Sequence, residues 1–111
     1  MKLGRRIVEA ASEKQAEHIV LLDTRKICSF ADYFVVCSAA SDRQIGAVAD
    51  EISRVLKAEG ILTHRSEGTA ESGWVLLDFG DVIVHVFSPL QRDYYKLDEL
   101  WGNAVTVVTI Q

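Results

Sequence analysis

The sequence predicts an α/β domain with a single mixed β-sheet and helices packed mainly on one face of that sheet. Three observations lead to this prediction. An amphipathic helical pattern opens the chain, several apolar segments of strand length follow, and a long helical pattern separates them into two groups. Helices and strands that alternate in this way pack as layers around one core. With 111 residues, 49% of them hydrophobic, the chain can form that core without disulfides or a structural metal.

The first third of the chain contains one helical pattern and two strand patterns. Residues 3–15 place Leu3, Ile7 and two alanines at helical spacing between charged residues, which predicts an amphipathic helix. Residues 18–23 form a short apolar run that ends in polar residues, and we expect a buried strand there. Residues 32–38 are rich in aromatic and β-branched side chains, which predicts a second strand.

The clearest helix covers residues 42–59. Ser41 and Gln44 have the spacing of a capping box, in which the serine hydroxyl accepts from the backbone N–H three residues on and the glutamine side chain accepts from the serine N–H. Gly60 can end the helix in the left-handed conformation. The apolar stripe that predicts the buried side consists of Ile45, Val48, Ala49, Ile52, Val55 and Leu56.

A β-hairpin is the most informative prediction for the second half of the chain. Residues 61–67 predict a short strand, and the loop 68–73 leads into strands over 74–79 and 82–87, which Gly80-Asp81 joins as a two-residue turn. The register that follows pairs apolar residues on one face: Phe79 with Val82, Leu77 with Val84, and Val75 with Val86. The opposite face is mixed and pairs Asp78 with Ile83, Leu76 with His85, and Trp74 with Phe87. We expect the first of these, the front face, to fill the core, and the second, the reverse face, to carry the function.

The end of the chain is expected to form one more helix, followed by a segment that is either a tail or an edge strand. Pro89 can open a helix because its fixed φ suits the first turn, and a break in that helix is expected near Lys96. Its buried side would consist of Leu90, Tyr94, Leu97, Leu100 and Trp101. Residues 104–111 are uncharged and mostly β-branched. We therefore expect one domain over 1–103, followed by a C-terminal tail or edge strand over 104–111.

Composition and charge exclude several classes of protein. The formal net charge is −4, and residues 67–103 contain two basic residues against seven acidic ones. Because nonspecific nucleic-acid binding depends on clustered Lys and Arg, we expect little direct nucleic-acid binding and a basic protein partner. No apolar run approaches the roughly 20 residues of a membrane span, and the N-terminal residues lack the apolar core of a signal peptide. Two cysteines without a Cys-x-x-Cys arrangement fit a reducing compartment, which predicts a cytoplasmic location.

The sequence contains no complete catalytic or cofactor-binding motif. Asp78-Phe79-Gly80 matches a protein-kinase triplet, but the chain is too short for a kinase and has no glycine-rich loop. Asp78 and Asp81 point to opposite sides of the predicted turn, and the three histidines lie on separate elements without cysteines at ligand spacing, so we expect no metal site. Cys37 and His85 would form a nucleophile pair only if neighbouring strands brought them together, and a buried inert cysteine is the simpler interpretation. We predict no enzyme activity and no cofactor.

The reverse face has two interpretations. Five of its members could be covered as ordinary core by another layer or by a second copy of the chain: Trp74, Leu76, Ile83, His85 and Phe87. They could instead form a recognition surface, since soluble monomers seldom leave a continuous apolar patch open and aromatic anchors dominate interface energies. Asp78 and Asp81 at its edge would then steer a basic partner toward it.

Several motifs follow one another along the chain: Ala-Asp-Tyr-Phe-Val-Val at 31–36, Ser-Asp-Arg-Gln at 41–44, Glu-Gly at 67–68, the continuous segment 73–87, and Tyr-Tyr-x-Leu-x-x-Leu-Trp at 94–101. In this order they resemble the ribosomal silencing factor RsfS (Iojap) family. The resemblance spans about residues 3–103. It implies a nucleotidyltransferase-like fold without the catalytic acids. It also implies that the protein binds the L-fourteen protein of the large ribosomal subunit and blocks subunit joining, repressing translation under nutrient limitation.

By position, the resemblance assigns partner contacts to Trp74, Leu76, Asp78, Asp81, His85 and Phe87, with Asp42 and Arg43 as further candidates that also serve the helix start. Members of the family are often homodimers when free, so a second copy would cover the reverse face until the ribosome replaces it. The apolar ending departs from the polar tail expected for the family. Two alternatives stay open, a nucleotidyltransferase-like enzyme and an adaptor subunit of another assembly.

Overall fold

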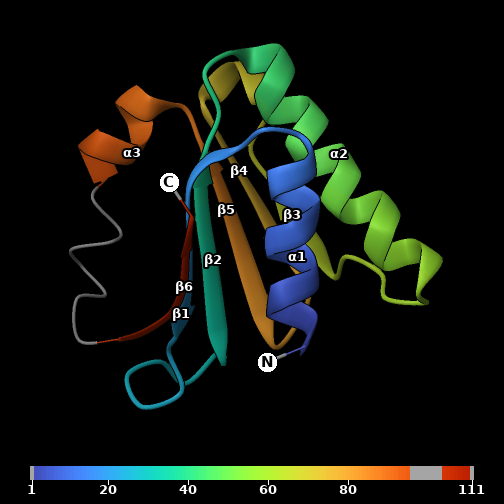
Figure 1. The fold of residues 1–111 in the computed structure, drawn as a ribbon, viewed down its shortest axis with the longest axis vertical. Coiled ribbons are helices and arrows are strands. Elements are labelled where there is room, and N and C mark those ends of the chain that lie inside the picture. Colours follow the sequence, from blue (N-terminus) through green and yellow to red (C-terminus); the bar gives the residue numbers. More distant parts are fainter. Residues whose placement is uncertain (1, 96–103, 111) are drawn as a thin grey trace.

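A computed structural model of the protein describes residues 2–95 and 104–110. These residues form one mixed β-sheet with helices packed beside it (Figure 1). The described elements, in order, are α1 (Lys2–Glu13), β1 (Glu17–Asp23), β2 (Tyr33–Ser38), α2 (Asp42–Ala58), β3 (Arg65–Glu67), a 3₁₀ turn η1 (Ala70–Ser72), β4 (Trp74–Asp78), β5 (Val82–Phe87), α3 (Pro89–Tyr95) and β6 (Val105–Ile110).

The sheet has six strands in the order β3-β4-β5-β2-β1-β6, within the part of the chain that the structure describes. Strands β2 and β5 pair in parallel, and the other neighbouring pairs are antiparallel. The chain therefore enters the middle of the sheet, passes through α2 to the β3 edge, and returns inward through β4 and β5. The prediction of one mixed sheet in an α/β fold is confirmed, whereas its likeness to nucleotidyltransferases stays a prediction.

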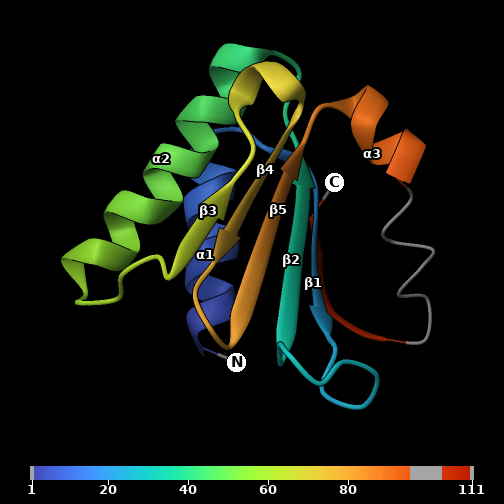
Figure 2. The ribbon, with the colours of Figure 1, turned by 180° about the vertical axis from the view of Figure 1, so that it is seen from behind.

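Helices α1 and α2 pack side by side against one face of the sheet (Figures 1 and 2). Between them and the sheet lies the main core, in which the helical stripe of α2 meets inward residues of β1, β2, β4 and β5. The fully buried members include Ile7, Ile19, Leu21, Val35, Ile45, Val48, Ile52, Val82 and Val84. A helix α3 lies beyond the end of β5, away from α1 and α2, so the helices gather mainly on one face as predicted.

The predicted ends of α2 are right in position and partly wrong in detail. The Ser41 hydroxyl accepts from the Gln44 N–H at 3.1 Å, but the Gln44 side-chain oxygen accepts from Ala40 N–H, not from Ser41. The amide nitrogen of Gln44 donates to the carbonyls of Lys14 and Gln15 at the end of α1. One glutamine side chain thus joins the start of α2 to the end of α1, a contact that spacing along the sequence does not reveal.

The C-terminal end of α2 explains why β3 is shorter than the predicted strand 61–67. Gly60 has a φ of +84°, and the N–H of Ile61 turns back to the Leu56 carbonyl at 2.9 Å, which is the Schellman arrangement. Since Ile61 completes the helix end, it is not available for a strand. Sheet pairing begins with the His64 N–H, which donates to the Asp78 carbonyl at 2.7 Å.

The hairpin of β4 and β5 has the predicted register. Trp74 lies opposite Phe87, Leu76 opposite His85, and Asp78 opposite Ile83, with the apolar pairs between them. The Phe79 N–H donates to the Val82 carbonyl at 2.9 Å, and Gly80 adopts a φ of +91° in the turn. A positive φ at this place is what a tight hairpin turn requires, and glycine supplies it without strain.

The last described elements correct one prediction and decide another. The prediction that Leu90 and Tyr94 lie on the buried side of the helix after Pro89 is wrong, because they are 77% and 76% exposed. Helix α3 is held through its other side, where the Arg92 guanidinium donates to Ser38 Oγ at 3.0 Å. The rest of that predicted side, from Leu97 to Trp101, lies outside the described residues. The C-terminal segment forms β6, an edge strand paired with β1.

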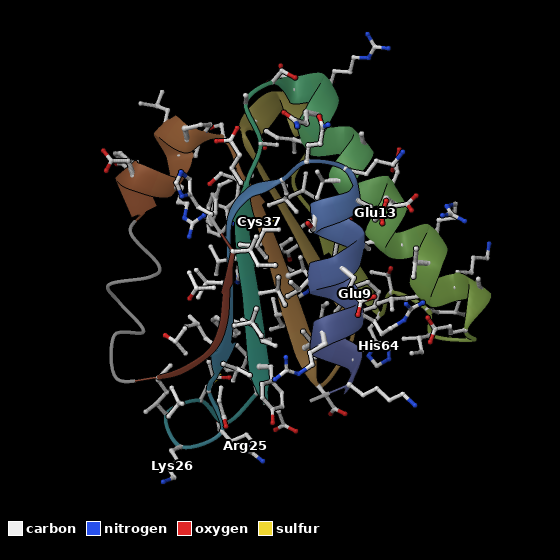
Figure 3. The ribbon with its side chains drawn as sticks, in the orientation of Figure 1. Glu9, Glu13, Arg25, Lys26, Cys37 and His64 are labelled. Atoms are coloured by element: carbon white, nitrogen blue, oxygen red, sulfur yellow. The ribbon has the colours of Figure 1, made fainter. Side chains whose placement is uncertain are left out.

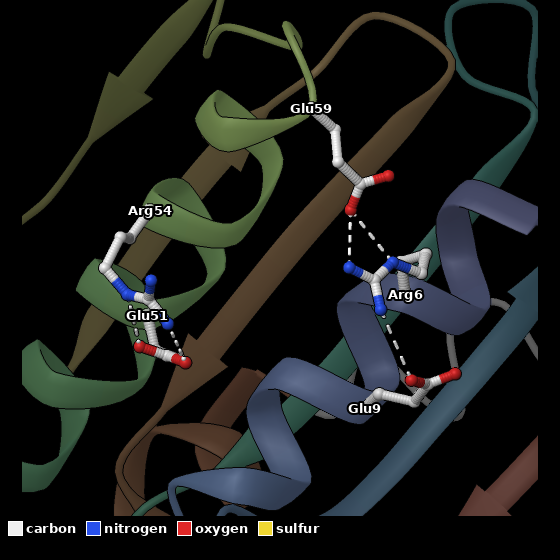
Figure 4. Close-up of polar contacts among 5 residues, drawn as sticks. All are labelled: Arg6, Glu9, Glu51, Arg54 and Glu59. Atoms are coloured by element: carbon white, nitrogen blue, oxygen red, sulfur yellow. Dashed lines mark hydrogen bonds and ion pairs between the residues drawn. The ribbon is translucent and has the colours of Figure 1, made fainter.

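Ion pairs lie on the outer surfaces of the two main helices, and one of them joins α1 to the end of α2 (Figure 4). Arg6 of α1 contacts Glu59 at the end of α2 at 2.5 Å and Glu9 on its own helix at 3.5 Å. On α2, Arg54 contacts Glu51 at 2.8 Å and lowers the pKa of that carboxyl through the hydrogen bond between them. Such exposed pairs contribute little to stability, so the core must hold the two helices together.

Candidate functional site: the reverse face of the hairpin

The reverse face is open along β4 and covered along β5. Its β5 members are buried, with Ile83 and His85 each 5% exposed and Phe87 0%. Its β4 members, Trp74, Leu76 and Asp78, are all partly exposed. Along β5 this face is therefore part of the core, as the first interpretation expects. Along β4 it is accessible surface, as the second interpretation requires.

Strand order accounts for this division. Strand β5 lies between β4 and β2, so neighbouring side chains shield it on both sides. Ile83 packs in a second, smaller cluster that includes Leu22, Ala31 and Phe34. Strand β4 instead has the three-residue β3 as its outer neighbour, which pairs only with the segment Leu76–Asp78. Trp74 lies beyond the end of that pairing, next to the sheet edge.

Trp74 is held against a group of buried rings. Its indole Nε1 donates to His85 Nδ1 at 3.1 Å, and its ring centroid lies 4.9 Å from that of Phe87. His85 in turn stacks on Phe87 at 6.0 Å and contacts Phe34 edge-on at 5.2 Å. The indole is therefore the exposed end of an aromatic cluster that continues into the sheet.

The imidazole of His85 is neutral because burial lowers its pKa to about 4. A neutral imidazole has one donor and one acceptor nitrogen. Since Nδ1 accepts the indole hydrogen, the proton belongs on Nε2, which is buried and has no hydrogen-bond partner among the described residues. His85 thus acts as an acceptor toward Trp74 and not as a charged group.

Two hollows flank the exposed part of β4. One, of about 520 Å³, is bordered by Phe30, Arg65 and Asp78. The other, of about 320 Å³, is bordered by Glu67, Ser72 and Gln91. Trp74 and Leu76 line both hollows and form the ridge between them.

Sequence reasoning missed three residues that line the larger hollow, namely Phe30, Arg65 and the buried Phe34. Phe30 is 64% exposed and lies in the loop between β1 and β2, where no periodic pattern marks it. Arg65 lies opposite Asp78 in the β3–β4 pair, and the correct length and register of β3 would have been needed to place it. The reverse face consequently includes a cation as well as the predicted acids.

The two hairpin acids occupy different positions. Asp78 Oδ1 accepts from the Gly80 N–H at 2.8 Å, so this carboxylate stabilises the turn and borders the larger hollow. Asp81 is exposed in the turn itself, and its backbone carbonyl accepts from Asp32 and Tyr33. The turn and Trp74 are at opposite ends of β4, so Asp81 lies away from the indole.

The helix-start candidates Asp42 and Arg43 are apart from the reverse face. Both are exposed in the first turn of α2, whose buried side packs on the front face of the sheet. Asp42 is in the position where a carboxylate interacts favourably with the helix dipole. The structure therefore brings together the β4 and β5 candidates but not this pair.

The nucleophile hypothesis for Cys37 and His85 is excluded by their directions. Val36 lies opposite His85 across the β2–β5 pair, and Cys37 lies opposite Val86. Cys37, which Figure 3 labels, therefore projects into the main core, while His85 projects to the reverse face. Burial raises the pKa of the Cys37 thiol to about 12, so it remains protonated and inert.

Two further observations concern metals and membranes. Within residues 2–95 and 104–110, no three side chains of His, Cys, Asp or Glu come together as a metal site would require. None of the described helices is long and apolar enough to cross a bilayer.

Comparison with known proteins gives one consistent family. The family model described as "Ribosomal silencing factor during starvation" matches residues 2–111. A protein of Bacillus subtilis named ribosomal silencing factor RsfS is 46% identical over 95 residues, which cover 86% of this chain and 80% of that protein. A protein of the same name from Halalkalibacterium halodurans is 44% identical over 100 residues, covering 90% and 86%.

Two solved structures are also similar in fold. A crystal structure of a Chromobacterium violaceum protein matches with a TM-score of 0.88 and 38% identity, covering 91% of this chain and 84% of that one. A Bacillus halodurans crystal structure matches with a TM-score of 0.82 and 39% identity, covering 94% of both chains.

The sequence of the maize protein Iojap, chloroplastic, is 37% identical over 91% of this chain and 44% of its own length.

Proposed function

This chain belongs to the ribosomal silencing factor family, and from that premise we propose that it represses translation by occupying a surface of the large ribosomal subunit. In this proposal the reverse face binds the L-fourteen protein, and the bound factor blocks joining of the small subunit when nutrients are scarce. Ribosomal silencing is the role that the names of its relatives give. The docking surface, the partner and the steric block are the proposed part.

The half-open reverse face is the observation that supports this proposal most strongly. Trp74 and Leu76 form a partly exposed apolar ridge between two hollows, and the buried rings of His85 and Phe87 pack against Trp74. Aromatic anchors beside pockets are typical of the residues that dominate binding energy. Because a stable complex buries roughly 1,200–2,000 Å² in total, the partner must also cover neighbours such as Phe30.

Charge around the ridge favours a basic partner. Glu67 and Asp78 border the hollows, and the chain as a whole carries a net charge of −4. Arg65 offsets part of this charge locally. Peripheral charges of this kind mainly accelerate association, so added salt should lower the association rate more than it raises the dissociation rate.

Co-sedimentation with isolated large subunits tests the docking surface. Replacing Trp74 by Ala removes the ridge residue and should weaken the affinity about thirtyfold or more, since truncating a central aromatic anchor typically costs about 2 kcal/mol or more. Leu62→Ala is the matched control, because Leu62 is 61% exposed and lines neither hollow. Wild-type binding by Trp74→Ala would contradict the assignment of the ridge.

Two further measurements separate the partner from the mechanism. Binding to purified L-fourteen protein should show the same dependence on Trp74 as binding to whole subunits. Light scattering of mixed small and large subunits should fall when the protein is added, and Trp74→Ala should restore it. If the protein binds large subunits but not L-fourteen, the assignment of L-fourteen as the partner is wrong. If it binds large subunits but does not reduce subunit joining, the proposed steric block is wrong.

We infer in addition that a second copy of the chain covers the same ridge when no ribosome is present. The exposed Phe30 beside Trp74 and Leu76 gives this part of the surface an apolar character that favours self-association. Sedimentation equilibrium should then report a dimer for the wild type and a monomer for Trp74→Ala. A wild-type monomer at all concentrations would rule out this state without affecting the docking proposal.

A further inference from the structure

We propose that His85 is a positioning residue that fixes the Trp74 indole in the orientation needed for docking, an inference that rests on the proposed function for its biological meaning. The carrying observation is the hydrogen bond from Trp74 Nε1 to His85 Nδ1 at 3.1 Å. His85 itself is only 5% exposed and forms part of the wall of the larger hollow, so a partner contacts chiefly the indole.

The hydrogen bond restricts the orientation of the Trp74 indole, whereas its ring contacts alone would only exclude water. A tryptophan near a strand edge can populate several staggered rotamers. The Phe87 ring, 4.9 Å away and inclined by 32°, provides a surface against which the indole can pack. The Nε1 donor selects, among the orientations that pack, the one in which it reaches His85 Nδ1.

Packing alone does not explain an imidazole at position 85. The Nε2 atom is buried without a hydrogen-bond partner among the described residues, and an unpaired buried donor is unfavourable. A leucine would fill part of this space without that penalty. An imidazole at this position is explained by its other nitrogen, Nδ1, which accepts the hydrogen bond from the indole.

Fixing the indole also fixes the shape that a partner meets. Trp74 is a shared wall of the hollows of about 320 and 520 Å³, so rotation of its ring would enlarge one hollow at the expense of the other. A side chain already held in its binding orientation loses less conformational freedom on association. His85 is therefore expected to affect affinity chiefly through the indole that it holds.

A matched pair of variants tests this role in the full chain. His85→Asn and His85→Leu have side chains with the same branching and leave similar cavities, but only the asparagine oxygen can replace Nδ1 as an acceptor. The chain contains two tryptophans, so Trp101→Phe leaves Trp74 as the sole indole signal. Fluorescence anisotropy of Trp74 in the free protein is read together with affinity for isolated large subunits.

His85→Leu should lower the anisotropy of Trp74 and weaken binding about tenfold, the effect of losing one hydrogen bond of ordinary strength. His85→Asn should stay near the unsubstituted chain in both measurements. Equal losses in the two variants would reduce His85 to a packing residue, and an unchanged anisotropy in His85→Leu would overturn the proposal. Since anisotropy needs no ribosome, it decides the positioning role even if subunit binding fails.

A second variant keeps the proposal testable if His85→Leu does not fold. Trp74→Phe removes the donor and leaves His85 in place. In a double-mutant cycle, His85→Gln, whose amide reaches the position of Nε2 and not that of Nδ1, should weaken binding in the wild-type background but not in the Trp74→Phe background, because the bond that it breaks is already absent there. An undiminished effect of His85→Gln in that background would show that position 85 acts by another route and would overturn the proposal.

Discussion

The two faces of the β4–β5 hairpin differ although they alternate along the same two strands. The front face, formed by Val75, Leu77, Phe79, Val82, Val84 and Val86, is wholly part of the main core beneath α1 and α2. The reverse face has rings, an imidazole and a carboxylate, and it is covered only along β5. The difference teaches that one strand can supply stability with every second residue and accessible surface with the residues between.

The front face should be the more sensitive of the two to truncation. Leu77→Ala removes a side chain that is 4% exposed and should lower the free energy of unfolding by about 2–5 kcal/mol. Leu76→Ala is the matched substitution one residue away on the ridge, and it should cost clearly less stability but reduce subunit binding. Urea denaturation and co-sedimentation check both, and equal stability losses would remove the distinction between the faces.

Acid should weaken the protein through the buried histidine of the reverse face. The pKa of His85 is lowered from 6.5 to about 4 in the folded chain, so between these values the unfolded chain binds a proton that the folded chain does not. The free energy of unfolding therefore falls as pH drops from about 6.5 to about 4, by up to roughly 3 kcal/mol. Above that window both states are neutral at this residue and it contributes no pH dependence.

Denaturation curves at pH 7, 5.5 and 4.5 measure this loss. His85→Asn is the control, because it removes the imidazole while the carboxyls that titrate at lower pH, such as Glu51, remain. The wild type should lose more stability than the variant across the window. Parallel pH profiles would mean that His85 is solvated or already charged in the folded chain.

A glycine substitution can disturb the reverse face from the backbone side. Gly68 has a φ of +81°, and a Cβ placed there would lie 2.0 Å from the Trp74 carbonyl oxygen. Gly68→Ala should therefore cost about 1–3 kcal/mol and displace the start of β4. Gly60→Ala is the control, since Gly60 has a similar φ of +84° but no atom within 4 Å of the added carbon.

Thermal melts and Trp74 fluorescence distinguish these glycine variants. Both should lose stability from backbone strain, but only Gly68→Ala should also alter the indole signal and subunit binding. A matching loss of binding in Gly60→Ala would indicate that the effect is global and not confined to the reverse face.

The smallest effect is expected at the outer surface of the helices. Arg6→Ala removes the exposed contacts with Glu59 and Glu9, and exposed pairs are weakened by salt and by the mobility of long side chains. Its melting temperature should change less than that of any variant above, and less still in high salt. A loss comparable to that of Leu77→Ala would mean that this pair, and not the core, holds α1 to α2.

Much of the hairpin could be predicted from sequence because its determinants are local. Gly80 and its neighbours set the turn, and a turn of known length sets the register of every pair that follows. The stripe of α2 and its end at Gly60 are local for the same reason. These features depend on residues within a few positions of one another, and all of them are found in the structure.

Several features of the candidate site depend instead on contacts between distant segments. Phe30 and Arg65 border the larger hollow only because the β1–β2 loop and β3 lie on either side of β4 and β5. The exposure of Leu90 and Tyr94 follows from how α3 attaches through Arg92. No periodic pattern in the sequence carries this information, so these residues were missed or placed on the wrong side.

The amino-acid order alone thus determined which residues share each face of the hairpin, since alternation along a strand is a property of the backbone. Only the tertiary structure decided which half of the reverse face stays accessible. Strand β5 received neighbours on both sides, whereas β4 received the short β3 at the sheet edge. Exposure is decided by what the rest of the chain places alongside a strand, and that is why Trp74 reaches solvent while His85 supports it from below.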